Sequence, residues 1–222
     1  MIGLYMEISA VIFDMDGLMF DTERMAQRAW QRAALAYDYQ VSDEVYLGVI
    51  GKARDGVGGY LRRALGEGFP FEQVYALKQY YLHEDIKENG LPLKPGLLEL
   101  QDVLETRAIP MAVASSSPCE TILFNLDKAG LQLERYKAVI GGDEVARGKP
   151  APDIFLKAAN KLQVRPDRCM VIEDSIAGIT AAYVAGMIPV MVPDLIQPTE
   201  EVAEKAYRIL ASLQDVVTLL PG

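Results

Sequence analysis

The chain has 222 residues, half of them hydrophobic, and its 31 acidic and 22 basic side chains give a formal net charge of −9. These numbers predict a globular protein with room for one full domain and a smaller second one, and the lack of a basic stripe excludes nucleic acid and anionic membranes as expected partners. No apolar stretch approaches the ~20 residues of a membrane span, and the N-terminal residues lack the charged start and long apolar run of a signal peptide.

Short apolar runs alternate with helical patterns along most of the chain. The apolar runs predict buried strands at residues 8–14, 109–116, 137–142, 168–174 and 188–194. Their apolar residues are continuous, as is typical of strands that are covered on both faces. Helical patterns occur at residues 96–108, 120–130, 152–164 and 175–187. This repetition predicts an α/β fold with a doubly wound parallel sheet, whose ligands bind at the carboxyl ends of the strands.

The segment that follows the first predicted strand differs from the rest of the chain. It contains helical patterns and no convincing strand before the Lys-Pro-Gly of residues 94–96. Residues 22–39 begin with a Thr-Glu start signal, and residues 70–89 begin with a proline, so both are predicted to be helices. The aromatic side chains expected in the core of this helical unit are Trp30, Tyr75, Tyr80 and Tyr81.

These patterns predict two domains. Residues 1–21 and 95–222 form the α/β core, and residues 22–94 form an all-helical cap domain inserted after the first strand. We expect the insert to lie above the active end of that strand, where the joining loops would act as hinges.

Two acids follow the first predicted strand. Side chains of a strand repeat every two residues, so Asp14 and Asp16 can both face one pocket at the strand end. Two carboxylates ~4 Å apart repel by about 1 kcal/mol in water and ~4 kcal/mol at an effective dielectric constant near 20, so a cation must offset them or one must stay protonated. The alternative is that both are solvated loop acids that cap the next helix, a role that suits Asp21, just before Thr22, better.

Polar residues also end other predicted strands. Ser115, Ser116 and Ser117 follow the second strand, and a later strand ends in Glu173 and Asp174. Between them, Lys149 lies in a loop that contains two prolines. Each of these features is weak by itself, but together they place acids, hydroxyls and one ammonium at the same edge of one sheet.

Carboxylates from separate strands are the ligands that a hard cation needs. Mg²⁺ keeps several waters, so Asp14 and Asp174 with a backbone carbonyl near Asp16 would suffice, and Glu173 would act through water or indirectly. Zinc is disfavoured, because these motifs contain no cysteine and no histidine. A metal, a lysine and hydroxyls around a carboxylate form a site for phosphoryl transfer.

The motifs resemble those of the haloacid dehalogenase superfamily, in its β-phosphoglucomutase-like branch with a helical cap. "DMDGLMFDTE", "ASSS", "GKPAPDIF" and "EDSIAGI" occur in the order and spacing of that family, over nearly the whole chain. The resemblance implies a Rossmann-like core. It also implies that Asp14 is a nucleophile that forms an aspartyl-phosphate, and that Asp16 protonates the leaving oxygen and then activates the water.

The resemblance assigns the other polar residues as well. It implies that Ser115 holds a phosphate oxygen, with Ser116 as a further substrate contact, and that Lys149 bridges the phosphate and the nucleophile. Glu173 and Asp174 would anchor the Mg²⁺.

Two cap residues bear on the substrate. "GKARDG" places Arg54 where mutases of this branch carry an arginine that grips a second phosphate, and Lys52 lies near it. A surface arginine at the start of a helix is the alternative. Mutases also carry a histidine where this chain has Ala26, and a lysine where it has Pro118. These departures favour hydrolysis over isomerisation.

We therefore predict a Mg²⁺-dependent phosphatase of small phosphorylated metabolites, sugar phosphates above all. A β-phosphoglucomutase-type mutase is the enzymatic alternative. A receiver-like phospho-switch would lack both Asp16 and the helical insert, and a non-catalytic sugar-phosphate binder would not need the full catalytic set. Cys119 and Cys169 lie far apart without a CxxC spacing, which fits a reducing compartment, so we expect the protein in the cytoplasm. We also expect a monomer.

Overall fold

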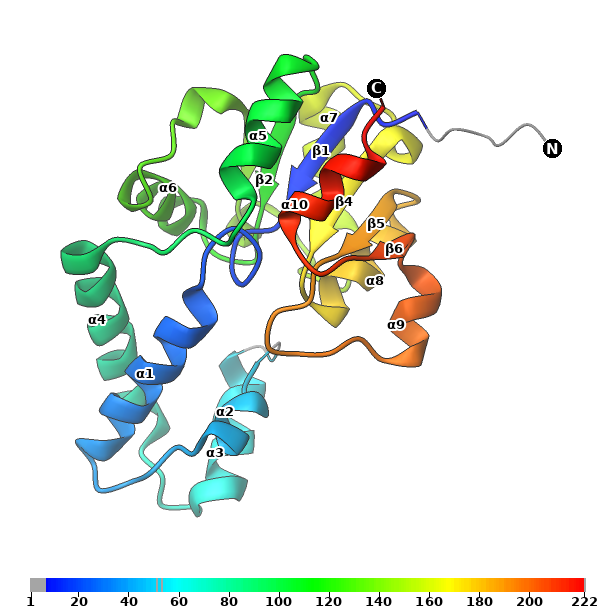
Figure 1. Cartoon of the computed structure of the whole chain (residues 1–222). Coiled ribbons are helices and arrows are strands. Elements are labelled where there is room, and N and C mark those ends of the chain that lie inside the picture. The colour runs from blue at the N-terminus through cyan, green and yellow to red at the C-terminus, as the bar shows by residue number, and fades with distance from the viewer. Residues whose placement is uncertain (1–6, 51, 53, 222) are drawn as a thin grey trace. The chain divides into compact units, whose positions relative to one another are not determined.

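The computed structural model describes residues 7–50, 52 and 54–221 (Figure 1). The chain divides into two compact units, one of Met1–Phe20 with Leu93–Gly222 and one of Asp21–Pro92. We call them the α/β unit and the helical unit. Among the described residues, every helix is too short or too polar to cross a bilayer.

The α/β unit is built on a parallel sheet of six strands in the order β3-β2-β1-β4-β5-β6. The strands are β1 (Ala10–Phe13), β2 (Met111–Ala114), β3 (Tyr136–Ile140), β4 (Cys169–Glu173), β5 (Ile188–Met191) and β6 (Arg208–Ile209). The predicted α/β fold is confirmed. Strand β1 lies between β2 and β4, with Ile12 beside Ala112 on one side and Val171 on the other.

Burial of the strands follows their place in the sheet. Every residue of β1, β2, β4 and β5 is buried, as the continuous apolar runs predict. The same expectation is wrong for β3, because β3 lies at the edge of the sheet and exposes Lys137. Strand β6, at the other edge, is exposed along its whole length and was not predicted.

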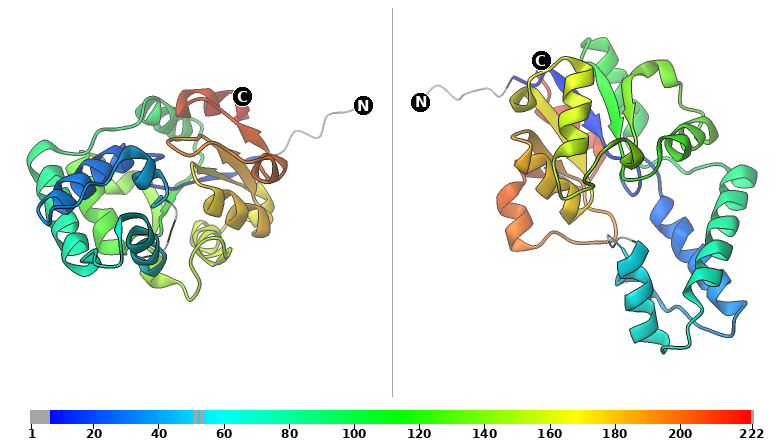
Figure 2. Two further views of the ribbon diagram at one scale, coloured as in Figure 1. Left: turned by 90° about the horizontal axis from the view of Figure 1, so that it is seen from below. Right: turned by 180° about the vertical axis from the view of Figure 1, so that it is seen from behind.

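Helices cover both faces of the sheet (Figure 2). They are α5 (Leu97–Thr106), α6 (Cys119–Lys128), α7 (Asp153–Leu162), α8 (Ile176–Val184), α9 (Glu200–Lys205) and α10 (Leu213–Val216). Short 3-10 helices are η1 (Leu133–Arg135), η2 (Gly142–Glu144), η3 (Pro166–Arg168) and η4 (Val217–Leu219). Because strand side chains alternate, Ala10 and Ile12 of β1 pack with Phe155 of α7 in one core cluster, and Val11 between them faces the other way.

The helical unit consists of α1 (Thr22–Leu35), α2 (Asp43–Leu47), α3 (Arg54–Leu65) and α4 (Phe71–Asn89). Its core contains Trp30, whose ring stacks on Phe71 at 6.2 Å between centroids and meets Tyr75 edge-on at 5.9 Å. Tyr81 is half-buried, but Tyr80 is 58% exposed, so its predicted place in the core is wrong. Adjacent residues of a helix lie about 100° apart, and only one of this pair can face inward.

The start of α1 also differs from the expectation. Asp21 occupies the N-cap position, but its side chain makes no capping hydrogen bond. Its Oδ1 accepts a hydrogen bond from Arg24 at 2.6 Å instead. The φ and ψ of Asp21, −80° and 48°, are not those of an extended N-cap residue, which keeps the carboxylate away from the first N–H groups of the helix.

Candidate active site

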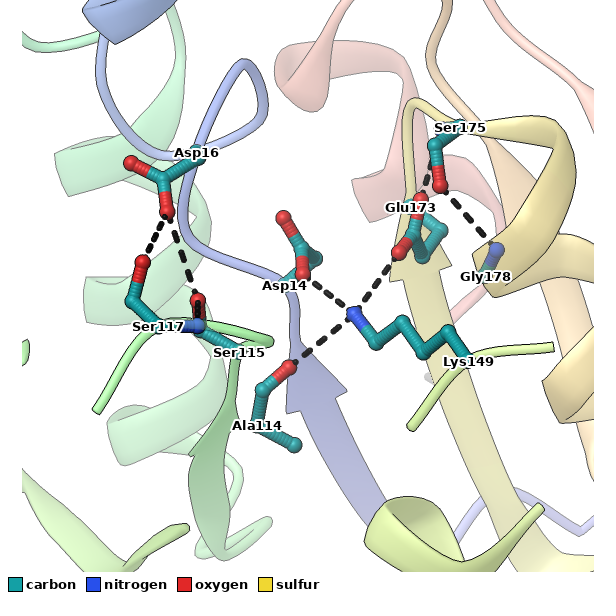
Figure 3. A network of polar contacts seen from close by, with 9 residues as sticks. All are labelled: Asp14, Asp16, Ala114, Ser115, Ser117, Lys149, Glu173, Ser175 and Gly178. Atoms are coloured by element: carbon teal, nitrogen blue, oxygen red, sulfur yellow. Dashed lines mark hydrogen bonds and ion pairs between the residues drawn. The ribbon is translucent and has the colours of Figure 1, made fainter. Parts of the chain in front are cut away.

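The predicted site residues of the α/β unit gather at the carboxyl ends of three neighbouring strands (Figure 3). Asp14 follows β1, Ser115 follows β2, and Glu173 ends β4. Because β1 lies between the other two strands, these ends are adjacent, and polar side chains that would be costly inside the sheet meet at its edge.

Lys149 connects the buried carboxylates of this edge. Its ammonium donates to Asp14 Oδ1, to Glu173 Oε1 at 2.8 Å and to the carbonyl oxygen of Ala114 at 3.3 Å. The side chains of Lys149, Asp14 and Glu173 are all at most 8% exposed. The ammonium also lies 4.8 Å from the ring centroid of the buried Phe155. These contacts fix the Lys149 ammonium in place, so that its positive charge lies between the carboxylates of Asp14 and Glu173.

Burial and charge both shift the ionisation of this cluster. Burial raises the pKa of Asp14 and outweighs the opposing charge of Lys149, and the charges of Glu173 and Asp16 add to the rise. Burial acts to lower the pKa of Lys149, but the charges of Asp14 and Glu173 outweigh it and hold this pKa above its usual range. The ammonium therefore stays charged, and the site contains more carboxylates than it has cations to offset them.

The acidic cluster fits a divalent cation. One carboxylate oxygen each from Asp14, Glu173 and Asp174 lie within 4.8 Å of one another. The set consists of oxygen donors alone, which suits a hard ion such as Mg²⁺. Gly17 makes room for the Asp174 carboxylate, because a Cβ atom on Gly17 would lie 2.4 Å from Asp174 Oδ2. The structure thus brings together the acids that the strand ends predict.

Glu173 is held by protein groups at both oxygens. Its Oε1 accepts from Lys149, and its Oε2 accepts from the backbone N–H of Ser175 at 2.6 Å. The hydroxyl of Ser175 accepts in turn from the N–H of Gly178 at 3.0 Å, which caps α8. Sequence reasoning gave Ser175 and Gly178 no role, although a serine directly before the first residues of a helix is a capping signal.

Asp16 belongs to a separate network. Its Oδ2 accepts from the hydroxyl of Ser117 at 3.0 Å and from that of Ser115 at 3.3 Å. Figure 3 shows the Asp16 carboxylate turned toward these serines, whereas Asp14 faces Lys149. Sequence reasoning listed Ser117 among the strand-end hydroxyls without a function. Ser116 is exposed between the two serines, and its contact with substrate stays a prediction.

The two predicted cap residues lie in the helical unit. Arg54, the first residue of α3, donates to Glu72 Oε2 at 2.5 Å and lies 4.8 Å from the ring centroid of Tyr75. Lys52 lies 5.6 Å from the ring centroid of Tyr60. Their role in binding substrate stays a prediction.

Comparisons with known proteins show the family of the chain. The model of the haloacid dehalogenase-like hydrolase family matches residues 8–186. A phosphorylated carbohydrates phosphatase of Thermotoga maritima is 32% identical over 220 residues, which cover 96% of this chain and 90% of the relative.

Solved structures show the same likeness. CbbY of Rhodobacter sphaeroides, in complex with xylulose-(1,5)bisphosphate, aligns with a TM-score of 0.77 and 26% identity over 94% of this chain and 96% of that one. β-Phosphoglucomutase of Clostridium difficile aligns with a TM-score of 0.73 and 26% identity over 94% and 93% of the two chains. The resemblance that the motifs indicate is confirmed. The chain belongs to the haloacid dehalogenase-like hydrolase family and is a phosphoric monoester hydrolase of its β-phosphoglucomutase-like branch.

Proposed function

We propose that the protein is a Mg²⁺-dependent phosphatase of small phosphorylated metabolites, sugar phosphates above all, that acts through an aspartyl-phosphate. The observation that carries this proposal is the convergence of Asp14, Glu173 and Asp174 within 4.8 Å of one another, with Lys149 bonded to the first two. Phosphoryl transfer needs a nucleophile, a proton donor and neutralised phosphate oxygens, and this edge of the sheet supplies side chains for each.

The first half-reaction transfers the phosphoryl group to the enzyme. Asp14 attacks phosphorus, the bond from phosphorus to the ester oxygen breaks, and that oxygen leaves with the electron pair and takes the proton carried by Asp16. Lys149 orients Asp14 through Oδ1, and Figure 3 shows the second oxygen of Asp14 pointing away from the ammonium. The hydroxyl of Ser115 binds a phosphate oxygen, with Ser116 as a further contact.

The second half-reaction releases phosphate. The aspartyl-phosphate is a mixed anhydride, so the covalent step divides one difficult displacement into two easier ones. A water oxygen attacks phosphorus and gives a proton to the Asp16 carboxylate, the bond from phosphorus to Asp14 breaks, and orthophosphate leaves. Both catalytic carboxylates then have the protonation states with which they started.

The acidic cluster would hold the metal. Asp14, Asp174 and the backbone carbonyl of Asp16 are the proposed ligands, and Glu173 acts indirectly, since both of its oxygens have protein partners. When bound, Mg²⁺ would neutralise charge on the phosphate oxygens.

The substrate class is proposed from the relatives. The Thermotoga relative is named for phosphorylated carbohydrates, and the CbbY structure contains a sugar bisphosphate. This chain carries Pro118 and Ala26 at the positions of the mutase lysine and histidine, which supports hydrolysis.

A screen for phosphate release tests the proposal. The purified protein with Mg²⁺ is assayed against phosphorylated sugars, sugar acids and nucleotides, with Asp14→Asn as the matched control. We expect the wild-type protein to hydrolyse sugar monophosphates and the variant to be inactive while it keeps its circular dichroism spectrum. An Asp14→Asn protein with near wild-type activity would show that the nucleophile is misassigned.

The mutase alternative is tested in the same assay. β-Glucose 1-phosphate with its bisphosphate activator is followed by ³¹P nuclear magnetic resonance. A phosphatase releases inorganic phosphate throughout the reaction, whereas a mutase converts one sugar phosphate into another without net release.

A further inference from the structure

The loop that follows β2 holds the proposed general acid. The hydroxyl of Ser117 donates to Asp16 Oδ2 at 3.0 Å, the shorter of the two serine contacts with this carboxylate. We propose that Ser117 is a positioning residue: it keeps the Asp16 carboxyl in place for proton transfer to the leaving oxygen. The inference rests on the proposed function and deepens it.

Ser115 cannot serve this purpose during the reaction. Its hydroxyl already accepts from the N–H of Ser117 at 3.1 Å, and the proposed function assigns it to a phosphate oxygen. A hydroxyl has a single proton to donate, so a Ser115 that donates to phosphate no longer donates to Asp16. The Ser117 hydroxyl is then the remaining serine donor to this carboxylate.

The backbone around Ser117 is held by the segment that follows β3. The N–H of Gly142, which follows β3, donates to the carbonyl oxygen of Ser117 at 2.9 Å. A Cβ atom on Gly142 would lie 2.3 Å from the carbonyl oxygen of Ser116, so the two loops are packed backbone against backbone. Asp143 Oδ1 also accepts from the N–H of Cys119 at 2.9 Å. A hydroxyl on so constrained a loop defines the position of its partner closely.

Anchoring one oxygen of Asp16 leaves the other for proton transfer. A general acid must lie within about 2.6–3.2 Å of the oxygen that it protonates, and a carboxyl that rotates freely spends little time there. The loss of efficient proton transfer matters most for an alkoxide leaving group, which leaves poorly without a proton. A p-nitrophenolate leaves well by itself. The leaving group therefore distinguishes a defect in proton transfer from a general structural defect.

The experiment compares kcat/KM for two esters: p-nitrophenyl phosphate and the sugar monophosphate that the wild-type enzyme hydrolyses fastest. This constant includes steps only up to departure of the alcohol, so the second half-reaction does not enter it. We expect Ser117→Ala to lower kcat/KM about tenfold for the sugar phosphate and no more than about twofold for the aryl ester. Ser117→Thr, which keeps the hydroxyl, should restore the sugar phosphate value to within about threefold.

Three further proteins make the test specific: Asp16→Asn, the double variant Asp16→Asn/Ser117→Ala, and Ser212→Ala. In an Asp16→Asn background, Ser117→Ala should change kcat/KM for the sugar phosphate by less than about twofold, because Ser117 acts through Asp16. Ser212→Ala is the control, since that hydroxyl bonds to Asp215 at the start of α10, and it should match wild type on both esters.

The results distinguish a failure of this inference from a failure of the proposed function. Equal losses on the two esters in Ser117→Ala, or a full further loss in the Asp16→Asn background, overturn the inference while the phosphatase assignment stands. A wild-type protein that hydrolyses neither ester overturns the proposed function, and the inference falls with it.

Discussion

Gly178 lies so close to Glu173 that a Cβ atom built on the glycine would stand 1.7 Å from Glu173 Oε1. That oxygen accepts the hydrogen bond from Lys149, and the other carboxylate oxygen accepts from the N–H of Ser175. The first turn of α8 therefore encloses the Glu173 carboxylate. Any side chain at position 178 must displace a carboxylate that holds the lysine of the site.

Gly178→Ala is expected to damage both activity and stability. Displacement of Glu173 breaks two charge-assisted hydrogen bonds, worth about 1.5–3 kcal/mol each, and the gain in helix propensity of about 1 kcal/mol offsets only part of this. We expect the free energy of unfolding to fall by about 2 kcal/mol, as measured in urea. Movement of Lys149 should lower kcat/KM about a hundredfold.

Gly59→Ala is the matched control for this substitution. Gly59 lies within α3, and among the described residues a Cβ atom there would meet only Arg63 Nη1, at 3.5 Å. This variant should keep its activity and gain up to about 1 kcal/mol of stability from helix propensity. If Gly178→Ala behaves like Gly59→Ala, the enclosure of Glu173 has no functional consequence.

Removal of divalent cations should stop hydrolysis, and Mg²⁺ should restore it. A ligand that binds only the native state stabilises it, by about 2.7 kcal/mol at a concentration a hundred times its Kd. For a chain of this length the thermal midpoint should rise by about 5 °C or more when Mg²⁺ replaces EDTA. Differential scanning calorimetry measures this shift without an activity assay.

Asp174→Asn identifies the site of the ion. It should lose both the Mg²⁺-dependent shift in midpoint and the activity, whereas Asp167→Asn, at an exposed acid paired with Arg165, should keep both. Hydrolysis in the presence of EDTA, or an unchanged shift in Asp174→Asn, would contradict the proposed ligand set.

The sheet was predictable from the sequence because burial on both faces leaves a continuous apolar run. Strand β6 was not, since its two residues, Arg208 and Ile209, are exposed and carry no such signal. Helix α3 gives only a weak helical signal in the sequence, because its three glycines lower helix propensity. Gly58 is needed there for packing, because a Cβ atom would lie 2.9 Å from the ring of Phe71, and tertiary contacts override propensity.

The acidic cluster was predictable for a topological reason. Asp14 and Glu173 end neighbouring strands, so the order of the sheet brings them together. The bond between Ser117 and Asp16 was not predictable, because it depends on a loop conformation that Gly142 fixes from the segment after β3. Chemistry at strand ends can be inferred from strand order, but loop contacts require the coordinates.

Stability should fall steeply at alkaline pH because of Tyr136. Its buried Oη accepts from Gln101 Nε2 at 2.6 Å, and burial raises the pKa of Tyr136 to about 12, from an ordinary value of 10. The folded state therefore keeps a proton that the unfolded state loses above about pH 10, so the stabilisation is complete below that pH and disappears as the pH rises through the folded pKa. The slope approaches 1.36 kcal/mol per pH unit between the two pKa values.

Tyr136→Phe removes this dependence. The variant should be less stable than wild type at about pH 8, because Gln101 loses its acceptor, but the difference should shrink by about 1.4 kcal/mol at about pH 11. Urea unfolding at both pH values measures this. Tyr80→Phe, at an exposed tyrosine of α4, is the control and should show no change in the difference. A pH-independent difference for Tyr136→Phe would mean that Tyr136 titrates normally.

Arg54 is expected to bind the second phosphate of bisphosphate substrates. It is paired with Glu72, and both side chains are more than half exposed, so the pair contributes little to stability and a phosphate dianion can replace the carboxylate. Arg54→Ala should therefore raise KM for sugar bisphosphates about tenfold and leave KM for monophosphates within about twofold, since a charge-assisted hydrogen bond is worth about 1.5–3 kcal/mol.

Glu72→Gln should act oppositely and lower KM for bisphosphates, because it removes the competing charge. Arg63→Ala, at an exposed arginine of the same helix, controls for a general loss of positive charge. An equal effect of Arg54→Ala on both substrate classes would mean that Arg54 is a surface residue that Glu72 and Tyr75 hold in place, with no part in recognition of a second phosphate.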